Sequence, residues 1–583
     1  MKHFSNQSNG SHVGRMNNGG VIRRFALFPL MLLMLLLLPA GMVAQKAASS
    51  SKYIATYKSS TQTLTFKENV GETLPENSAW VEDRQRVTTI KNKLGNGTIV
   101  HIVFDKSFST YTPTSLYRFF EGLTKLETIT GLEYLNTAKV TDMHYMFGNC
   151  SKLPSLDVTN FNTAKVTDMS DMFKGCSALT SLDVTKFDTR NVTNMEGMFS
   201  SCSKLTSLDV TNFNTVNVKN MMKMFAGCQA LTSLDVTNFN SENVTNMNRM
   251  FYQCSKLTSL DVSNFNTKKV TNMGFMFSYC STLTTIYVND KFVIDKVTNG
   301  SYMFDNCTNL KDYAPSKKDH NYANYKTGYF TKLVGKNGDE KIGATGETLA
   351  TDNLVLDDDK DFVAYEPFAA KAASYNRTMK EGTTWATLCL PFEVSLENQN
   401  FRAFKLLSAD DVTETVELEE IETNIAAGTP VIIKMKDGAT ELNFTEADKT
   451  IAKDVQTAET ADANYKLQGI YTKKEFSKDT DNNCYIVKGD KLMNPAKLLG
   501  TSTKSVGSKP FRAYMVDNSS APAAGARMFS ISVGGSTTAI EQLETTADSK
   551  AEYYDLQGRR LQNLQKGVNI VKRGGKTMKV IIK

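Results

Sequence analysis

Residues 182–195 read Leu182-Asp183-Val184-Thr185-Lys186-Phe187-Asp188-Thr189-Arg190-Asn191-Val192-Thr193-Asn194-Met195 and lead into Met198-Phe199 and Cys202. The same unit recurs between Leu153 and Cys307. Its cysteines follow one another at steps of 26, 26, 26, 26, 26 and 27 residues, at Cys150, Cys176, Cys202, Cys228, Cys254, Cys280 and Cys307. A fixed period in this range predicts a solenoid, because one unit cannot bury its apolar face alone and stacked units share a continuous core.

Each unit combines a strand pattern with a helix pattern. Residues 182–185 alternate apolar and polar side chains, as in a short strand with two different faces. Apolar residues between 192 and 202 fall at offsets of 0, 3, 7 and 10, which is one helical face, with Thr193 or Asn194 as its N-cap. Strands stack about 4.8 Å apart, whereas helix axes need about 8–10 Å. The sequence therefore predicts a curved array with its strands on the concave face.

The array extends upstream in a degraded form. Residues 119–123 copy residues 146–150, with Leu123 in the cysteine position. The predicted fold is an α/β leucine-rich-repeat solenoid of about eight turns over residues 101–330, closed by atypical terminal turns.

The repeat also carries a family resemblance. Six turns show the unit Leu-Asp-Val-Thr-Asn-Phe-Asn-Thr…Val-Thr-Asn-Met…Met-Phe…Cys nearly unbroken. This unit resembles the BspA-type leucine-rich repeats (the DUF285 group) of bacterial surface proteins. Members of that family are mostly described as adhesins that contact host matrix proteins or other bacteria, and the resemblance implies a role of this kind here.

The N-terminus has the pattern of an export signal. Arg23 and Arg24 precede an apolar run over residues 25–38, and small residues then lead to Ala44. A membrane span normally needs about 20 apolar residues, so residues 1–44 are predicted to be a cleaved signal peptide, with an uncleaved anchor as the alternative. Whether translation begins at Met1 or at Met16 is also left open. The predicted location is the cell surface, the outer membrane or the extracellular space.

The remaining segments differ from the repeats in composition and in sequence pattern. Residues 45–100 are predicted to form a linker and an N-terminal β cap, and residues 331–374, rich in Gly, Asp, Lys and Thr, a linker. Spaced strand patterns over residues 375–540 predict a β-sandwich-like domain, which loosely resembles a β module of exported Bacteroidetes proteins. Residues 553–560 (Tyr-Tyr-Asp-Leu-Gln-Gly-Arg-Arg) and 566–571 (Lys-Gly-Val-Asn-Ile-Val) lie in a small β tail, 541–583. This tail resembles the sorting domains of type IX secretion cargo, with a simple terminal hairpin as the alternative.

A row of aspartates is the candidate binding site. The aspartates are Asp157, Asp183, Asp209, Asp235 and Asp261, with Ser181 and Thr185 as neighbours in one turn. Unit charges about 4.8 Å apart repel by roughly 1 kcal/mol even in water, so the row needs compensation. Hydrogen bonds from Ser and Thr, nearby lysines, a cation or a basic partner would each supply it. A solvated row without a ligand and a protein-binding strip on the concave face are both open.

The other repeated side chains have structural interpretations. Equivalent thiols on stacked turns point in parallel, and local C-x₂₋₄-C pairs are absent from the sequence, so the cysteines and the methionine rows are predicted to be core filler rather than disulfides or metal ligands. Cys389 and Cys484 are left as a possible pair. The asparagines before each phenylalanine and at the caps are expected to bond backbone groups at the corners.

Motifs for catalysis are missing from the sequence. The three histidines after residue 44 are His101, His144 and His320, and none lies in H-E-x-x-H. The chain contains 67 basic and 61 acidic residues without long runs of one sign, which does not favour nucleic acid. We predict a binding protein without a cofactor or enzyme activity, whose partners are proteins on host matrix or bacterial surfaces. Glycan binding, or glycan or peptide processing in residues 375–540, is the alternative.

Overall fold

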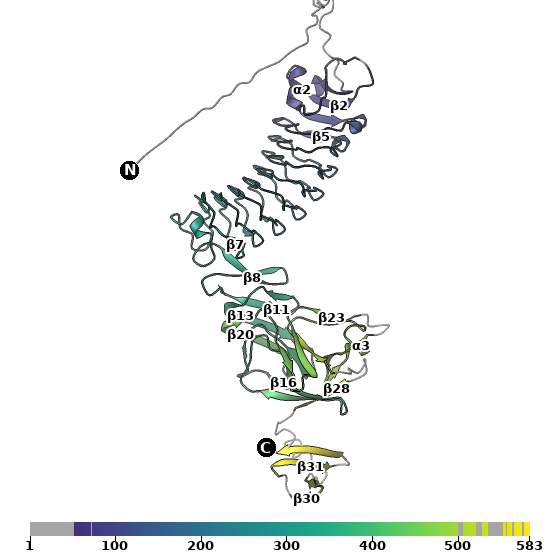
Figure 1. Ribbon diagram of the computed structural model, residues 1–583, viewed down its shortest axis with the longest axis vertical. Helices are drawn as coiled ribbons and strands as arrows, with labels where there is room; N and C mark the ends of the chain where they lie inside the picture. Colours follow the sequence, from purple (N-terminus) through teal and green to yellow (C-terminus); the bar gives the residue numbers. More distant parts are fainter. Residues whose placement is uncertain are drawn as a thin grey trace, which may run out of the picture. The chain divides into compact units, whose positions relative to one another are not determined.

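The computed structural model describes residues 52–71, 73–499, 505–519, 528–533, 552–555, 557–562, 565–573 and 576–582. The predicted signal peptide lies outside these residues. The described chain is mostly β (Figure 1), and its α-helices are α2 (Val87–Lys93) and α3 (Pro495–Leu498). Within these ranges, neither helix is long and apolar enough to cross a membrane.

A mixed sheet precedes the repeats. It contains β1 (Tyr53–Lys58), β2 (Thr63–Glu68), β3 (Ser78–Trp80), β4 (His101–Phe104) and β5 (Thr128–Thr130), in the order β3-β1-β2-β4-β5. The 3₁₀ segment η1 (Ser59–Thr61) lies between β1 and β2, η2 (Lys106–Thr110) lies between β4 and β5, and η3 (Leu132–Tyr134) follows β5. Phe66 and Phe104 lie on the buried face of β2 and β4, with ring centroids 4.8 Å apart. The parallel pairing of β2, β4 and β5 leads directly into the repeats.

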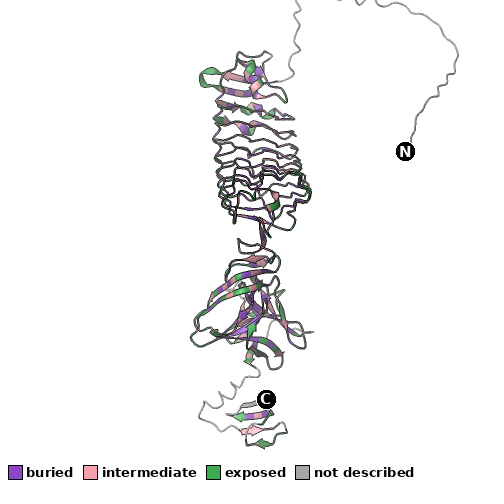
Figure 2. Ribbon diagram, turned by 90° about the vertical axis from the view of Figure 1, so that its left-hand side faces the viewer, coloured by how far each residue is buried: buried purple, intermediate pink, exposed green. Residues whose placement is uncertain are grey.

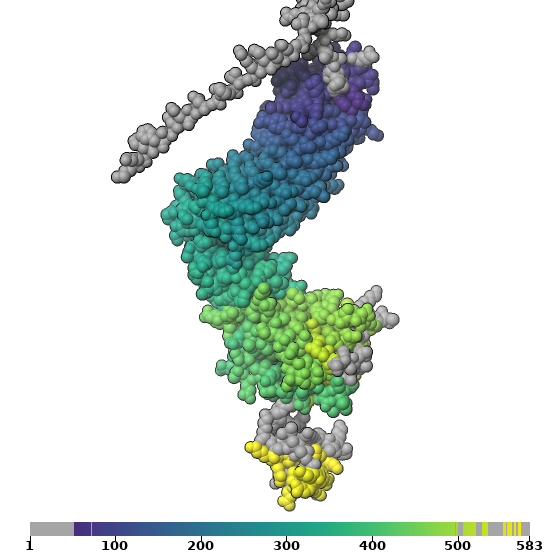
Figure 3. Space-filling view, viewed as in Figure 1, coloured from purple at the N-terminus to yellow at the C-terminus, as the bar shows by residue number. Residues whose placement is uncertain are grey.

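The repeat stack (residues 115–310) consists of coils that lie one on the next (Figure 1). Parallel β-bridges join one residue of each coil to its counterpart: Ser115, Asp142, Asp168, Asn194, Asn220, Asn246, Asn272 and Asn299. In the space-filling view the coils form a continuous body (Figure 3).

The prediction of a helix in each coil is wrong. All of residues 115–310 are described, and the stack contains no α-helix. Each coil instead places two residues, four apart, in the left-handed backbone region, for example Asp171 (φ 53°) with Gly175 (φ 73°) and Gly197 (φ 57°) with Ser201 (φ 61°). Left-handed residues cannot continue a right-handed helix, so the segment turns tightly instead.

Hydrogen bonding within this segment alternates between two partners. The amides of Phe173 and Gly175 donate to carbonyls of the next coil, at 2.9 and 2.7 Å. The intervening amides close tight turns within the coil, as when Cys176 N donates to Phe173 O at 3.1 Å. Backbone donors that a helix would satisfy internally therefore hold neighbouring coils together.

The opposite side of the coil also differs from expectation. Among the described residues of the stack, strand pairing on that side is confined to β5 at one end and to β6 (Ser259–Asp261) and β7 (Thr285–Val288) at the other. Residues 182–184 are not paired as a strand, and a turn begins at Thr185. The phenylalanines on the turn side are 5.7–5.8 Å apart between ring centroids, well below the spacing of helices. The stack therefore has no wide helical side, which was the physical reason for expecting the strands on the concave face.

Buried residues recur along the coils of the stack, as the purple segments of the ribbon show (Figure 2). In one coil Val192, Met195, Met198, Phe199 and Cys202 are all fully buried. The predictions of buried cysteines and of methionines as core filler are confirmed by this burial.

Residues 331–374 form strands, so the prediction that they are a linker is wrong. These are β8 (Thr331–Asn337), β9 (Glu340–Ala344), β10 (Ala350–Thr351), β11 (Leu354–Asp357), β12 (Phe362–Ala364) and the start of β13 (Phe368–Thr378). β8 pairs with β7, which continues the repeats into a sheet of order β12-β8-β7-β6, with β9 on β8. Alternating buried residues such as Leu354 and Leu356 anchor the segment in an apolar core.

The β-rich region that follows is built on two larger sheets. One has the order β10-β13-β11 with β20 on β13, and the other the order β14-β19-β16-β17-β28-β25-β24-β27-β22-β21. β15 pairs with β18, and β23 with β26. Buried side chains form separate apolar clusters around Tyr375 and around Tyr485. The additional elements are η4 (His320–Tyr322), β14 (Trp385–Leu388), β15 (Val394–Ser395), β16 (Phe401–Asp410), β17 (Thr415–Ile421), β18 (Asn424–Ile425), β19 (Val431–Met435), β20 (Glu441–Ile451), β21 (Thr457–Glu459), β22 (Tyr465–Ile470), β23 (Lys474–Phe476), β24 (Cys484–Lys488), β25 (Lys491–Met493), β26 (Val506–Ser508), β27 (Arg512–Asp517) and β28 (Met528–Val533).

The C-terminal residues form a separate antiparallel sheet. Its strands are β29 (Glu552–Tyr554), β30 (Arg560–Leu561), β31 (Gly567–Arg573) and β32 (Lys576–Ile582), in the order β30-β29-β31-β32. This sheet contains both sequence motifs that resemble a sorting domain.

Candidate functional site

The Asp face is the surface that carries Asp157, Asp183, Asp209, Asp235 and Asp261. The first four are exposed, each on a separate coil. Each of these four carboxylates is fixed by the threonine two residues later. Asp183 Oδ1 accepts the Thr185 amide at 2.9 Å and the Thr185 hydroxyl at 2.6 Å. Thr185 is therefore engaged by the aspartate, whereas Ser181 is exposed.

For three of these aspartates the hydrogen bonds also favour the charged carboxylate. The threonine hydroxyl, followed by the threonine amide, lowers the pKa of Asp157, Asp183 and Asp209 below the usual carboxylate value. Bonds to an ionised acceptor are among the stronger protein hydrogen bonds, so they offset the mutual repulsion within the row. The second carboxylate oxygen of Asp183 and Asp209 has no donor among the described residues and faces solvent or a partner.

Asparagines support the corners beside the row. The Asn212 amide donates to Thr185 O at 3.2 Å, and Asn238 donates to Thr211 O at 2.9 Å, each one coil back. The capping asparagines accept backbone amides two residues on, as Asn194 does from Glu196 at 3.1 Å. The prediction that asparagines bond corner backbone is confirmed for these residues, although they cap turns and not helices.

Asp261 ends the Asp face and differs from its counterparts. Its side chain is 7% exposed and forms an ion pair with Lys341 of β9 at 2.8 Å. It lines a cavity of about 630 Å³ whose other walls include Asn264, Lys332 and Glu366. Asp261 is therefore screened from solvent, and the open part of the Asp face consists of the four upstream aspartates.

Lys332 fixes the floor of this cavity. Its ammonium group lies 2.8 Å from both Asp290 and Glu366 and is 6% exposed. Burial lowers the pKa of Lys332, but its bonds to Asp290 and then Glu366 outweigh burial and raise it. This ion-pair arrangement joins the last coil to β8 and serves a structural purpose.

A smaller hollow of about 280 Å³ lies over the first coils. Its walls include Tyr117, His144, Asp168 and Glu196. His144 is half-buried, since its ring stacks on Tyr117 at 5.3 Å and its Nδ1 lies 2.5 Å from Ser170 Oγ. Among the described residues, no group of three or more His, Cys, Asp or Glu side chains is arranged to hold a metal ion.

Comparison with known proteins gives a family match within the repeat stack. Residues 114–230 and 201–317 match the family described as "Mycoplasma protein of unknown function, DUF285". The match covers well under half of the chain. The crystal structure of a leucine rich cell surface protein from Faecalibacterium prausnitzii is 14% identical, with 46% of this chain and 94% of that chain covered and a TM-score of 0.16. No curated protein matches the chain.

The repeat stack contains a buried hydroxyl ladder that was not predicted from the sequence. In each coil a hydroxyl accepts a backbone amide of the next coil and donates to the carbonyl of the same residue. Thr163 does so with Asp188, at 2.7 and 3.0 Å, and Ser241 with Asn266, at 2.8 and 3.1 Å. The 26-residue recurrence of Thr or Ser at this position was the available signal. The ladder fixes the register between neighbouring coils, and its buried hydroxyl groups are not available to a ligand.

The thiols of the repeat stack are also engaged in hydrogen bonds. Each donates to the carbonyl of the phenylalanine in the preceding coil, as Cys202 does to Phe173 at 3.2 Å. Burial raises the pKa of every one of these thiols, including Cys202 and Cys228. Cys389 and Cys484 are also buried and free, and they belong to different apolar clusters. The structure therefore does not pair them.

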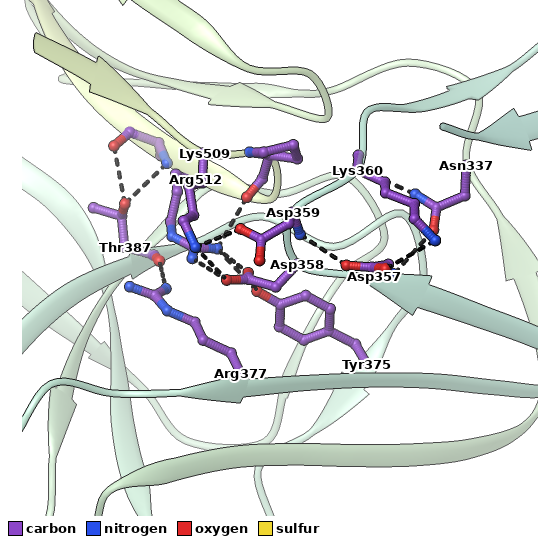
Figure 4. A network of polar contacts seen from close by, with 12 residues as sticks. Asn337, Asp357, Asp358, Asp359, Lys360, Tyr375, Arg377, Thr387, Lys509 and Arg512 are labelled. Atoms are coloured by element: carbon purple, nitrogen blue, oxygen red, sulfur yellow. Dashed lines mark hydrogen bonds and ion pairs between the residues drawn. The ribbon is translucent and has the colours of Figure 1, made fainter. Parts of the chain in front are cut away.

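The β-rich region holds a buried polar network (Figure 4). Arg512 of β27 binds both oxygens of Asp358, at 2.7 and 2.8 Å, and Tyr375 of β13 donates to the same carboxylate. Burial opposes ionisation of Asp358, but Arg512 and Tyr375 outweigh it and lower the pKa of this carboxyl. Burial, with the charge of Arg512, lowers the pKa of Arg377 to about 10. Because Asp358 and Arg512 satisfy each other, the network joins strands and leaves neither group available as an acid, base or nucleophile.

Proposed function

We propose that this chain is an exported surface protein that binds other proteins through the Asp face of its repeat solenoid. The observation that carries the proposal is the row of exposed aspartates, each held in place by hydrogen bonds from its own threonine. A row of fixed negative charges is complementary to a surface of lysine and arginine on a partner. Pre-organised carboxylates lose little freedom on binding, which favours affinity.

Adhesion to host matrix or to other bacterial cells fits such a surface. Identical coils present the same carboxylate repeatedly, so several weak contacts would act together. The charged N-terminal segment with its apolar run supports export, and the motifs of the C-terminal sheet support sorting to the cell surface. Recognition without catalysis is part of the proposal, because the buried charges Asp358 and Arg512 neutralise each other.

The proposal is tested with Asp183→Asn, Asp209→Asn and Asp235→Asn combined in the full chain. Asparagine keeps the oxygen that accepts the threonine bonds, so the coils should fold normally. A control variant neutralises three exposed carboxylates elsewhere: Glu417→Gln, Asp437→Asn and Asp490→Asn. Both variants gain the same charge, so long-range effects are matched.

The probes are purified matrix proteins immobilised on a sensor and a poly-lysine peptide. Loss of binding in the Asp-face variant but not in the control would support the proposal. Equal binding by both variants, with unchanged unfolding curves, would exclude the Asp face as the contact surface.

A further inference from the structure

The last coils of the stack carry aromatic side chains at positions where other coils use glycine. Phe275, Tyr279 and Tyr302 occupy left-handed backbone positions, with φ of 59°, 62° and 57°. The position of Phe275 and Tyr302 is glycine in one upstream coil, at Gly197, and is tyrosine in another, at Tyr145. The position of Tyr279 is glycine in three upstream coils and a small or amide residue in the rest: Gly122, Asn149, Gly175, Ser201, Gly227 and Gln253.

Comparison among the coils shows whether their backbone requires an aromatic residue at these positions. Glycine adopts the left-handed region without steric cost, whereas a bulky side chain pays a free-energy penalty there. The backbone of the coil therefore does not need an aromatic residue. Strain retained at a site where glycine suffices points to a use for the side chain itself.

These rings gather on one surface, which we call the aromatic patch (Tyr252, Phe275, Tyr279 and Tyr302). Phe275 stacks on Tyr302 at 5.1 Å, and Tyr252 meets the edge of Tyr279 at 5.8 Å. Tyr279 and Tyr302 are both 43% exposed, so ring surface faces solvent. The contacts hold the rings in place before any ligand arrives.

A hollow of about 330 Å³ opens beside Tyr279. Its lining is neutral: the amides of Gln229, Gln253 and Asn306, three hydroxyl side chains, and Tyr279 itself. That volume is at the lower end of the range of about 300–1,000 Å³ typical of small-molecule sites. Two cations lie on other rings of the patch, Arg249 over Phe275 at 4.6 Å and Lys318 over Tyr302 at 4.5 Å, and neither of them lines the hollow.

The chemistry of this lining selects the class of ligand. Amides and hydroxyls both donate and accept hydrogen bonds, which matches the hydroxyl groups of a sugar. The electron-rich face of a tyrosine ring attracts the polarised C–H face of a pyranose. Charged peptides would find no counter-charge in the lining. We propose that the last three coils bind a neutral saccharide, with one sugar ring on Tyr279 and its hydroxyls toward the three amides.

This site is separate from the Asp face, so the two proposals fail independently. The experiment measures binding of a panel of neutral gluco-, manno-, galacto- and N-acetylglucosamine oligosaccharides to the full chain, by saturation-transfer NMR and calorimetry. Tyr279→Gly removes the ring yet restores the residue that other coils use, so the variant should fold at least as well. Lys223→Gly, at a left-handed position of an upstream coil, is the matched control.

At least one oligosaccharide should bind the wild type, and Tyr279→Gly should weaken it tenfold or more. Tyr279→Phe should bind within threefold of the wild type, and Lys223→Gly and the Asp-face variant should bind normally. The proposal is overturned if the whole panel fails to bind at millimolar concentration, or if Tyr279→Gly binds as the wild type does. It is also overturned if Tyr279→Gly loses an unglycosylated protein partner while the sugars never bind.

Discussion

The Thr189 hydroxyl and the Asn214 backbone exchange two hydrogen bonds across adjacent coils. Thr189 Oγ1 accepts the Asn214 amide at 2.7 Å and donates to the Asn214 carbonyl at 3.0 Å. Thr189 is almost fully buried, so water cannot replace either bond. One side chain thus satisfies both polar groups of a corner residue in the next coil.

Replacing this hydroxyl by a methyl group should be costly. Thr189→Val keeps the shape but leaves the Asn214 amide unsatisfied, and we expect a loss of about 1–3 kcal/mol in the free energy of unfolding. Thr189→Ser keeps the hydroxyl, as Ser241 does naturally, and should lose less. Urea unfolding of both variants provides the measurement, and equal stability of Val and Ser would show that the ladder is unimportant.

Two substitutions at left-handed positions should have opposite effects on the stability of the chain. Gly197 has φ of 57°, and an added Cβ would lie 2.1 Å from Asp171 Oδ1. Gly197→Ala should therefore destabilise the chain by about 1–2 kcal/mol. Lys223→Gly relieves the same backbone strain two residues before Phe225 and should not lower the midpoint of thermal unfolding. A stable Gly197→Ala variant would contradict the left-handed geometry.

Thiol chemistry tests the packing of the stack. Burial raises the pKa of Cys176 to about 12 and holds that of Cys202 well above its ordinary value, so the reactive thiolate is scarce at pH 8. A maleimide reagent should leave the repeat cysteines unmodified in the native protein and label all nine cysteines of the chain after unfolding in urea. Mass spectrometry after a short native pulse gives the count. Rapid native labelling of Cys202 would show that the coils do not pack as described.

The period of 26 residues was enough to predict stacked units and their buried cysteines, but not the shape of each coil. Val192, Met195, Phe199 and Cys202 have helical spacing, yet a coil of tight turns buries the same positions. Gly197 was the only residue of that coil to mark a left-handed turn, because Ser201 occupies the other one. Non-glycine residues in the left-handed region are rare enough that sequence patterns do not reveal them.

The candidate site was predictable in part. Alternation of residues 182–185 placed Asp183 outside and Leu182 inside, as found. The burial of Asp261 was not foreseeable, because Lys341 comes from a strand inside the segment expected to be a linker. The aromatic patch was hidden by the strong repeat, since Tyr279 and Tyr302 lie at positions that vary from coil to coil.

Salt and pH should separate the Asp face from nonspecific binding. The pKa of Asp157, Asp183 and Asp209 is lowered, so these carboxylates stay ionised as the pH falls toward the ordinary value of about 3.9. Poly-lysine binding should therefore persist unchanged from pH 7 to pH 5 and weaken steeply between 0.05 and about 0.5 M salt. Fluorescence anisotropy of a labelled peptide measures both. A loss of affinity centred between pH 5 and 7 would implicate histidine instead of the Asp face.

The Asp358–Arg512 pair predicts a different pH dependence, that of stability. Because the folded pKa of Asp358 lies below its unfolded value, its contribution is complete above about pH 4 and is lost as the pH falls through the folded pKa. Asp358→Asn leaves Arg512, 8% exposed, without its counter-charge. We expect this substitution to lower the free energy of unfolding by about 3–5 kcal/mol at pH 7.

Urea unfolding of wild type and Asp358→Asn between pH 3 and pH 8 tests this prediction. The difference between the two proteins should be constant from pH 5 to pH 8 and shrink below about pH 4, since protonation of Asp358 then removes the same charge. Asp437→Asn, at an exposed aspartate, should show no difference at any pH. A difference that stays constant down to pH 3 would mean that shape, and not the charge of Asp358, holds β27 against β13.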